Sequence, residues 1–275
     1  MNFLEYKKQI ENIFLNNNID KAEVNILFCE ALNCSITELF KKDELELKDK
    51  RKIDTAVKKR ILGKPIQKIF KKAYFCDYEF FVDNNVLCPR PETELLVEEC
   101  LKLAKKDDCV LDLCTGSGAI AITVQKKLGL KVVATDISSK ALKVAKKNAK
   151  NISANIEFIK SDMFVKVKSK FDIIVSNPPY IPTKDIQNLD REVRDFDPSI
   201  SLDGGSDGLD FYRLIAAYAK KYLNKNGKIL LEVGKGQSKK VKKMLEKNGF
   251  VCYIKKDYNN IERIVVGELY DWKMW

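Results

Sequence analysis

Histidine is absent from this chain of 275 residues. Its absence excludes Ser-His-Asp triads, imidazole general bases and histidine-ligated metal centres, because each of these needs an imidazole ring. None of the eight cysteines stands in a C-x-x-C pair, and we interpret them as reduced thiols. The sequence therefore predicts no metal site, and it predicts chemistry that proceeds without a base titrating near neutrality.

Long apolar runs are also missing. No stretch reaches the length of a membrane span, and residues 1–8 lack the apolar core of a signal peptide, so we expect a soluble, cytoplasmic protein with no membrane partner. A dense basic block is missing as well, because the lysines behind the formal net charge of +11 are interleaved with acidic residues. Solvated helix faces explain such a charge at least as well as a nucleic-acid footprint does, so no nucleic-acid partner is required.

What the chain does contain is enough material for one large and one small domain. In residues 1–72 apolar side chains recur at helical spacing without strand alternation, and we interpret this part as a small helical, substrate-docking domain. Residues 74–88 alternate aromatic and polar side chains, which predicts a β-hairpin with its turn at 83–85. This hairpin lies in a predicted linker of residues 73–90, and residues 91–275 form the second predicted domain.

Strands and helices alternate from residue 109 onward, which is the pattern of a mainly parallel, doubly wound α/β sheet. The predicted strands cover residues 109–113, 131–135, 156–159, 171–176, 228–233, 250–254 and 261–268, and the predicted helices cover 119–128, 138–150, 209–222 and 238–248. Such sheets bind their ligands at the carboxyl ends of the strands. The residues that follow each strand are therefore the candidates for a functional site.

A loop of small residues, 114–118, follows the first of these strands. Its glycines let the backbone approach a ligand closely, and the start of the next helix offers free amide donors. Asp136, 20 residues after Gly116, ends the next strand where a carboxylate can bind both ribose hydroxyls, and Asp162 follows the third strand where it can accept from an adenine amino group. The spacing departs from the G-x-G-x-x-G of dinucleotide enzymes, so an adenosine cofactor without pyrophosphate is favoured over NAD.

The predicted strand 171–176 ends at Asn177-Pro178-Pro179-Tyr180, where two prolines stop the sheet ladder and fix an extended turn. The Asn177 side-chain carbonyl and the Pro178 backbone carbonyl are acceptors, and the Tyr180 ring offers a flat wall. Two convergent acceptors beside an aromatic face suit a planar NH2 group. A plain surface turn uses the same residue types, but the glycine-containing loop upstream favours the functional interpretation.

Together these features resemble a class I S-adenosylmethionine-dependent methyltransferase that alkylates a planar amide or exocyclic amine. Five stretches narrow the resemblance to the HemK/PrmC-type peptide chain release factor glutamine methyltransferases, and the resemblance covers essentially the whole chain. These stretches are residues 63–67, 88–98, 175–181, 203–213 and 231–234. The R-P-E-T-E stretch at 90–94 combined with N-P-P-Y is far more specific than either motif alone.

The resemblance implies a seven-stranded Rossmann-like core, preceded by a small all-α domain and a hairpin linker. It implies an enzyme that uses S-adenosyl-L-methionine to methylate the side-chain nitrogen of the glutamine in the Gly-Gly-Gln motif of class I release factors. The implied cofactor-binding residues are Cys114, Thr115, Gly116, Ser117, Gly118, Asp136, Asp162, Met163 and Asn177. The implied substrate-binding residues are Asn177, Pro178, Pro179, Tyr180, Arg90 and Glu92, of which Asn177, Pro178 and Tyr180 are expected to be catalytic. A monomer is the default expectation.

The chain departs from the family pattern in two places. Cys114 stands where the family usually has glycine, which predicts a slightly wider loop and weaker cofactor binding. Asp197-Pro198 stands where Glu-Pro is more common, which leaves the nearby substrate contacts open.

Two other functions stay open on the sequence. An adenine N6-methyltransferase acting on DNA or RNA offers the same NH2 geometry to the same motif, although residues 1–72 show no aromatic and basic interleaving strong enough to read bases. A non-catalytic binding protein on a methyltransferase fold is the other alternative. The presence of Asp136, Asp162 and Asn177 counts against it.

Overall fold

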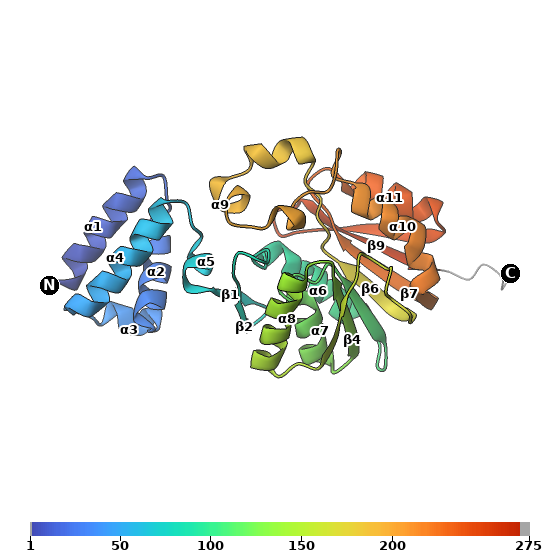
Figure 1. Cartoon of the computed structure of the whole chain (residues 1–275), viewed down its shortest axis with the longest axis horizontal. Helices are drawn as coiled ribbons and strands as arrows, with labels where there is room; N and C mark the ends of the chain where they lie inside the picture. The colour runs from blue at the N-terminus through green and yellow to red at the C-terminus, as the bar shows by residue number, and fades with distance from the viewer. Residues whose placement is uncertain (1, 270–275) are drawn as a thin grey trace. The chain divides into compact units, whose positions relative to one another are not determined.

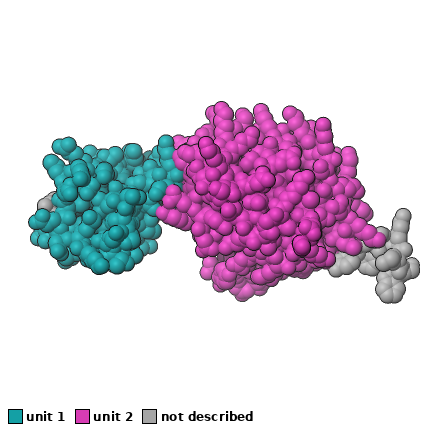
Figure 2. Space-filling view, turned by 90° about the horizontal axis from the view of Figure 1, so that it is seen from below, with its two compact units in different colours: residues 1–72, 191–196 teal, residues 73–190, 197–275 magenta. Residues whose placement is uncertain are grey.

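The computed structural model describes residues 2–269 of the chain. Two compact units are distinguished by colour in Figure 2: unit 1 comprises residues 1–72 and 191–196, and unit 2 comprises residues 73–190 and 197–275. The short piece 191–196 therefore groups with the helical unit, a division that the sequence did not predict. Within the described residues, no helix is both long and apolar enough to cross a membrane.

Unit 1 is a set of helices around an aromatic core. Its helices are α1 Phe3–Asn16, α2 Glu23–Leu32, α3 Ile36–Phe40, α4 Leu47–Ile61, α5 Ile66–Phe70 and α9 Arg191–Arg194 (Figure 1). The Phe3 and Tyr6 rings of α1 pack against Phe28 of α2 at centroid distances of 5.7 and 5.8 Å. Such aromatic pairs contribute about 0.5–1.5 kcal/mol beyond the apolar area they bury. The helices predicted from the apolar spacing of residues 1–72 are present.

A buried arginine joins three segments of unit 1. The Arg60 guanidinium of α4 donates to the Glu23 carboxylate at 2.6 Å from Nε and 2.9 Å from Nη2, and Nη2 also donates to Glu192. A buried guanidinium without carboxylate partners is costly. These ion pairs therefore hold the segment 191–196 against α2 and α4.

Unit 2 is a three-layer α/β unit, with helices on both sides of a central sheet (Figure 1). The sheet has seven strands in the order β5-β4-β3-β6-β7-β9-β8. The strands are β3 Cys109–Leu113, β4 Lys131–Asp136, β5 Ile156–Lys160, β6 Phe171–Ser176, β7 Leu223–Glu232, β8 Phe250–Lys256 and β9 Glu262–Leu269. Strands β3 to β7 pair in parallel, whereas β9 is antiparallel to β7 and β8. The predicted mainly parallel, seven-stranded, Rossmann-like sheet is confirmed.

Helices cover both faces of this sheet, which is why the central strands are apolar along their whole length. One face packs against α6 Pro91–Leu103, α7 Ala119–Leu128 and α8 Ser139–Ile152, and the other packs against α10 Asp210–Tyr222 and α11 Ser238–Lys247. In β6 the side chains of residues 173–175 are fully buried between these layers. The polar residues that end the strands are left at the rim of the sheet.

The hairpin differs from its predicted form. Strands β1 Lys72–Phe75 and β2 Tyr78–Phe81 are joined at Cys76 and Asp77, which have positive φ angles of 47° and 72°. The hairpin turn predicted at 83–85 was wrong. That segment forms a separate local turn, in which the Asp83 carboxylate accepts from the backbone N–H and from the side-chain amide of Asn85. A cysteine at positive φ is uncommon, so the true turn carries a weak sequence signal.

The remaining differences lie at element ends and in short helices. Strand β7 begins at Leu223 rather than at 228, and Asn226 adopts a φ of 61° within it. Two 3-10 helices, η1 Thr183–Asn188 and η2 Ser199–Ser201, were not predicted. They are too short to show an apolar period in the sequence.

Candidate active site

A cavity of about 390 Å³ lies at the carboxyl ends of the parallel strands. In the order of the sheet, β4 and β5 lie on one side of β3, and β6 and β7 lie on the other. This is the switch point at which open α/β sheets bind ligands. The Ser176 hydroxyl at the end of β6 donates to the Leu113 carbonyl at the end of β3 at 2.7 Å. The two strand ends that border the cavity are thereby held together.

The cavity wall contains seven of the site residues that the sequence predicted. They are Cys114, Gly116, Asp136, Asp162, Met163, Asn177 and Pro179. Thr115, Ser117, Gly118 and Pro178 are buried outside this wall, and Tyr180, Arg90 and Glu92 are partly buried outside it. The structure therefore brings the predicted acids, the glycine loop and the N-P-P-Y turn to one place, with part of each motif behind the surface.

Sequence reasoning missed most of the apolar wall, which includes Val86, Leu87, Ile200, Phe211 and Leu214. Phe211 and Leu214 stand three residues apart on a predicted helix, a spacing that places both on one face and could have indicated them. The other three follow the hairpin or lie near η2, where no period marks them.

The loop after β3 alternates left-handed backbone positions. Cys114, Gly116 and Gly118 have φ angles of 61°, 55° and 83°. A Cβ added at Gly116 would meet nothing within 4 Å, whereas one added at Gly118 would lie 2.9 Å from the Ile122 side chain and 3.2 Å from that of Ala145. Gly118 therefore allows α7 and α8 to pack closely, and Gly116 leaves the backbone open toward the cavity.

Two buried side chains hold this loop. Asp112 accepts from the Thr115 hydroxyl at 2.6 Å and from the Ala121 backbone at 3.2 Å, and burial raises its pKa to about 7. Asn148 of α8 donates from Nδ2 to the Ser117 carbonyl at 2.9 Å and to the Phe81 carbonyl of β2 at 3.0 Å. The hairpin and the loop thus share one amide anchor, which stabilises the cavity wall that each provides.

The two predicted acids differ in environment. Asp136 accepts from the backbone N–H of Gly116 at 2.9 Å and of Ser138 at 2.8 Å, and burial raises its pKa against the opposing effect of those two bonds. The Asp162 side chain is exposed at the cavity. Beside it, the sulfur atoms of Met163 and Cys114 approach to 3.7 Å. The cavity therefore presents two carboxylates along an otherwise largely apolar wall.

The N-P-P-Y turn presents one side chain to the cavity in a defined orientation. Asn177 donates from Nδ2 to the hydroxyl of Thr93, in α6, at 3.2 Å. Because the NH2 end of the amide is engaged there, the Oδ1 end is left as the acceptor that the site can use.

The backbone after Pro179 is packed against the loop of residues 203–210. Gln237 donates from Nε2 to the Tyr180 carbonyl at 2.8 Å and to the Gly208 carbonyl at 3.2 Å. A Cβ at Gly204 would lie 2.7 Å from the Tyr180 Cα atom, and one at Gly208 would lie 2.3 Å from the Tyr180 carbonyl oxygen. Glycine is therefore needed at both positions for the loop to reach the N-P-P-Y turn.

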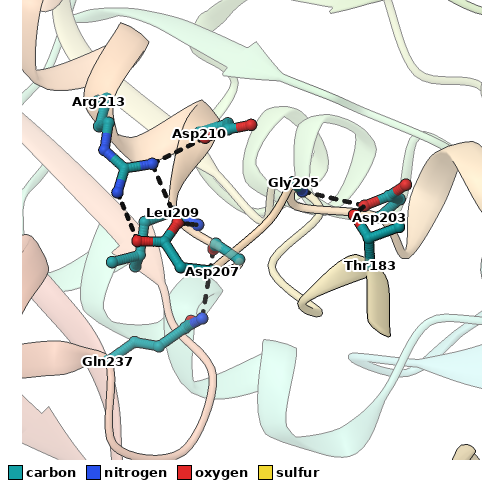
Figure 3. A network of polar contacts seen from close by, with 9 residues as sticks. Thr183, Asp203, Gly205, Asp207, Leu209, Asp210, Arg213 and Gln237 are labelled. Carbon is teal, nitrogen blue, oxygen red and sulfur yellow. Dashed lines mark hydrogen bonds and ion pairs between the residues drawn. The ribbon is translucent and has the colours of Figure 1, made fainter. Parts of the chain in front are cut away.

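Charged side chains brace the same loop (Figure 3). Asp203 accepts from the Thr183 hydroxyl at 2.7 Å and from the Gly205 backbone at 3.0 Å. Arg213 of α10 pairs with Asp207, and with Asp210 at 2.7 Å. Each of these exposed pairs is worth little alone, but the network limits the conformations that the loop can adopt.

Arg90 lies outside the cavity wall and pairs with Asp197, the residue at which the chain departs from its family pattern. Its Nη2 donates to Asp197 Oδ2 at 3.1 Å, and the Asp197 carboxylate is buried. The Asp-Pro pair therefore retains a carboxylate for Arg90. In this structure Arg90 contributes by holding the segment that carries Pro198 of the cavity wall.

The sequence assigned no role to Glu232, a fully buried carboxyl at the end of β7. Burial raises its pKa to about 7, against the effects of the Thr93 hydroxyl, Arg263 and the Asn177 amide, which favour its charged form. A group that titrates near neutrality therefore does not require histidine, because burial can give a carboxyl the titration range of a histidine. The expectation of chemistry without such a base stays a prediction. The signal was a glutamate ending an otherwise apolar strand.

The comparisons with known proteins agree with this geometry. A family model described as "Methyltransferase small domain" matches residues 90–192. A release factor glutamine methyltransferase of Geobacter sulfurreducens is 42% identical over 78% of this chain and 76% of its own length. One of Thermodesulfovibrio yellowstonii is 36% identical over 97% of this chain and 98% of its own length. The chain belongs to the release factor glutamine methyltransferase family.

Membership of the release factor glutamine methyltransferase family confirms the resemblance that the sequence motifs indicated, and it identifies the chain as a methyltransferase. Among solved structures, a methyltransferase of Pyrococcus furiosus has a TM-score of 0.57 at 19% identity, covering 78% of this chain and 98% of that one. That likeness supports the fold alone.

Proposed function

We propose that this protein transfers the methyl group of S-adenosyl-L-methionine to the side-chain amide nitrogen of the glutamine in the Gly-Gly-Gln motif of class I peptide chain release factors. The observation that carries the proposal is the orientation of Asn177, whose Nδ2 is engaged by Thr93 while the side chain borders the cavity. An acceptor oxygen is thereby presented where a planar NH2 group can bind. The protein acts as a monomer and needs no nucleic acid.

The residues around the cavity fit the methyl donor. Gly116 leaves open space beside a left-handed backbone, Asp136 offers a carboxylate for ribose hydroxyls, and Asp162 offers one for an adenine amino group. Among the described residues that line the cavity there is no lysine or arginine, which suits an adenosine group without phosphate. When bound, the donor supplies an electrophilic methyl group on a sulfonium.

The residues of the N-P-P-Y turn make the amide nitrogen reactive by holding it. An amide nitrogen is a weak nucleophile because its lone pair is delocalised into the carbonyl. Asn177 Oδ1 and the Pro178 carbonyl each accept one N–H, which turns the developing lone pair toward the donor. Positive charge that appears on the nitrogen strengthens both bonds, so they stabilise the transition state more than the ground state. Orientation alone can contribute about 7–11 kcal/mol.

No base is needed before transfer, because the N–H bonds are intact while the nitrogen attacks. The methylated nitrogen is strongly acidic and loses its extra proton to water afterwards. The chain, which has no histidine, can therefore carry out this reaction.

Docking of the release factor is assigned to unit 1. Among its described residues, eight large apolar side chains are exposed: Leu4, Ile13, Leu15, Ile26, Ile36, Phe40, Leu47 and Leu62. Exposed aromatic and aliphatic side chains are the usual anchors of protein interfaces.

The test offers labelled S-adenosyl-L-methionine with a purified class I release factor, the same factor with the motif glutamine changed to glutamate, and a duplex DNA. Peptide mass spectrometry then locates the methyl group. Label on the motif glutamine of the first substrate alone supports the proposal. Label on adenine with the release factor unmodified overturns it in favour of a nucleic-acid methyltransferase.

A further inference from the structure

We propose that Glu232 is a positioning residue for methyl transfer, and that its ionised carboxylate, acting with Thr93, sets which end of the Asn177 amide faces the substrate. The inference rests on the function proposed above and assigns a regulation by pH to the same site. It concerns residues of three elements that are far apart in the sequence: the start of α6, the end of β6 and the end of β7.

The geometry provides a buried chain of polar groups. Thr93 and Glu232 are 5% and 3% exposed, and the Thr93 hydroxyl accepts from Asn177 Nδ2 at 3.2 Å. Both the Thr93 hydroxyl and the Asn177 amide interact with the Glu232 carboxyl. Within the part of the chain that the structure describes, Glu232 Oε2 has no hydrogen-bond partner. A buried carboxyl with an unpartnered oxygen is costly, and its place beside the reacting turn indicates a role there.

The direction of these hydrogen bonds follows from the charge of the carboxyl. An ionised carboxylate only accepts, so it draws the hydroxyl proton of Thr93 and the NH2 end of Asn177 toward itself. The two ends of an asparagine amide have nearly the same shape, so packing cannot choose between them. The ionised carboxylate therefore fixes the orientation of the Asn177 amide, with Oδ1 turned toward the substrate NH2 group.

Protonation of Glu232 removes this preference for one orientation of the Asn177 amide. A neutral carboxyl can donate, and a Thr93 hydroxyl that accepts from it is free to donate to Asn177 Oδ1. The amide can then turn by half a rotation and present its own NH2 group to the NH2 group of the substrate. Two donors facing each other form no bond, so the arrangement with neutral Glu232 binds the reacting nitrogen poorly.

Groups from each neighbouring element act on the charge of Glu232. Arg263 of β9 favours the ionised form, and Glu92 of α6 opposes it. The Tyr180 and Tyr212 hydroxyls also sense this carboxyl and stay neutral, because burial raises the pKa of both, that of Tyr180 to about 12. Within this cluster, the Glu232 carboxyl is therefore the group that gains or loses its proton near its pKa of about 7.

The test is single-turnover methyl transfer to the release factor across about pH 5.5 to 8.5. With the wild-type protein, the rate is expected to rise about tenfold per pH unit below the pKa and to level off above it. Glu232→Gln is expected to abolish this dependence. Asp112→Asn is the matched control, because Asp112 also has a pKa of about 7 and supports the loop of residues 114–118. This variant is expected to keep the pH dependence of the rate.

Two variants of the intermediate residue separate positioning from packing. Thr93→Val keeps the shape of the side chain without its hydroxyl, and we expect about a tenfold loss of rate with little change in KM for the release factor. Thr93→Ser keeps the hydroxyl and is expected to restore both the rate and its pH dependence. Equal activity of the Val and Ser variants overturns the inference.

A readout without methyl donor or substrate tests the network directly. In protein labelled with 15N-asparagine, the side-chain NH2 resonances of Asn177, assigned by their loss in Asn177→Ala, are expected to shift with pH in the wild type and to stay constant in Glu232→Gln. A pH-independent resonance in the wild type overturns the inference. If the wild type modifies no release factor, the proposed function fails, while this titration still decides the role of Glu232.

Discussion

At the scale of single residues, the proposed mechanism depends most on the side chain of Asn177. In the proposed mechanism, the Pro178 carbonyl is one acceptor for a substrate NH2 group, and Asn177 Oδ1 is the second. Its orientation depends on Thr93, which holds Nδ2 at 3.2 Å. In the proposed mechanism, removing the amide removes a contact to the reacting nitrogen and leaves the residues around the rest of the cavity in place.

Asn177→Ala is expected to abolish turnover and leave the affinity for S-adenosyl-L-methionine nearly unchanged, because Gly116, Asp136 and Asp162 remain. Calorimetric titration measures the affinity, and methyl transfer to the release factor measures turnover. Asn155→Ala, at an exposed position, is the control and is expected to behave as the wild type. Activity of Asn177→Ala within tenfold of the wild type, a change worth about 1.4 kcal/mol, would contradict the role.

At the scale of elements, the N-P-P-Y turn depends on a loop that reaches it through glycines. The backbone of Ile181 exchanges hydrogen bonds with the loop, donating to Leu202 at 2.9 Å and accepting from Gly204 at 2.8 Å. Gln237, just before α11, adds a bond to the Tyr180 carbonyl. The N-P-P-Y turn is thus held by hydrogen bonds from the residues around the loop and from Gln237.

Gly208→Ala is expected to lower methyl transfer by at least about tenfold, because the new Cβ would lie 2.3 Å from the Tyr180 carbonyl oxygen and the turn must move. Gly129→Ala is the matched control, since Gly129 also has a positive φ, 69°, but a Cβ there meets nothing within 4 Å. Urea unfolding measures the stability that each variant loses through backbone strain. The transfer rates then show the additional effect of the contact between the new Cβ at position 208 and the turn. Equal losses of activity in the two variants would show that the contact with the turn is unimportant.

At the scale of the whole molecule, two buried carboxyls titrate near neutral pH in a chain that has no histidine. Asp112 and Glu232 each have a pKa raised by burial to about 7, from 3.8 and 4.5. The folded protein therefore holds protons that the unfolded chain has already lost. In that pH range, stability falls as the pH rises.

Accordingly, the free energy of unfolding is expected to decrease as the pH is raised from about 4.5 to about 7. Asp112→Asn is expected to make this decrease shallower, because the asparagine buries no charge when the pH is high. Compared with the wild type, the variant is therefore expected to be relatively more stable at pH 8 than at pH 5. Urea unfolding across this range measures both effects. A wild-type stability that does not fall as the pH is raised over this range would contradict the raised pKa values of these carboxyls.

Docking through unit 1 is also tested at this scale. Phe40 is 63% exposed, and Phe40→Ser is expected to raise the KM for a whole release factor severalfold while leaving transfer to a short Gly-Gly-Gln peptide unchanged. Tyr258→Ser, at an 88% exposed aromatic of unit 2, is the control. An equal change with both substrates would place the effect of Phe40 on folding or on the site.

By itself, the sequence determined the order of strands and helices in unit 2 and the motifs that follow them. Strand β6 and the turn at Asn177 were predictable because buried strands and prolines leave strong local patterns. Asp136 was predictable from its spacing to Gly116. These properties depend on neighbours in the chain, and the printed order of residues contains them.

Only the tertiary structure decided which groups act on the N-P-P-Y turn. Thr93, Gln237 and Glu232 come from α6, the start of α11 and β7, and their positions beside Asn177 and Tyr180 result from the packing of these elements around one sheet edge. Burial then moved a carboxyl pKa to about 7, an effect that depends on the surrounding protein rather than on residue type. A sequence pattern records periodicity along the chain, and it contains no signal for a contact that only the folded sheet creates.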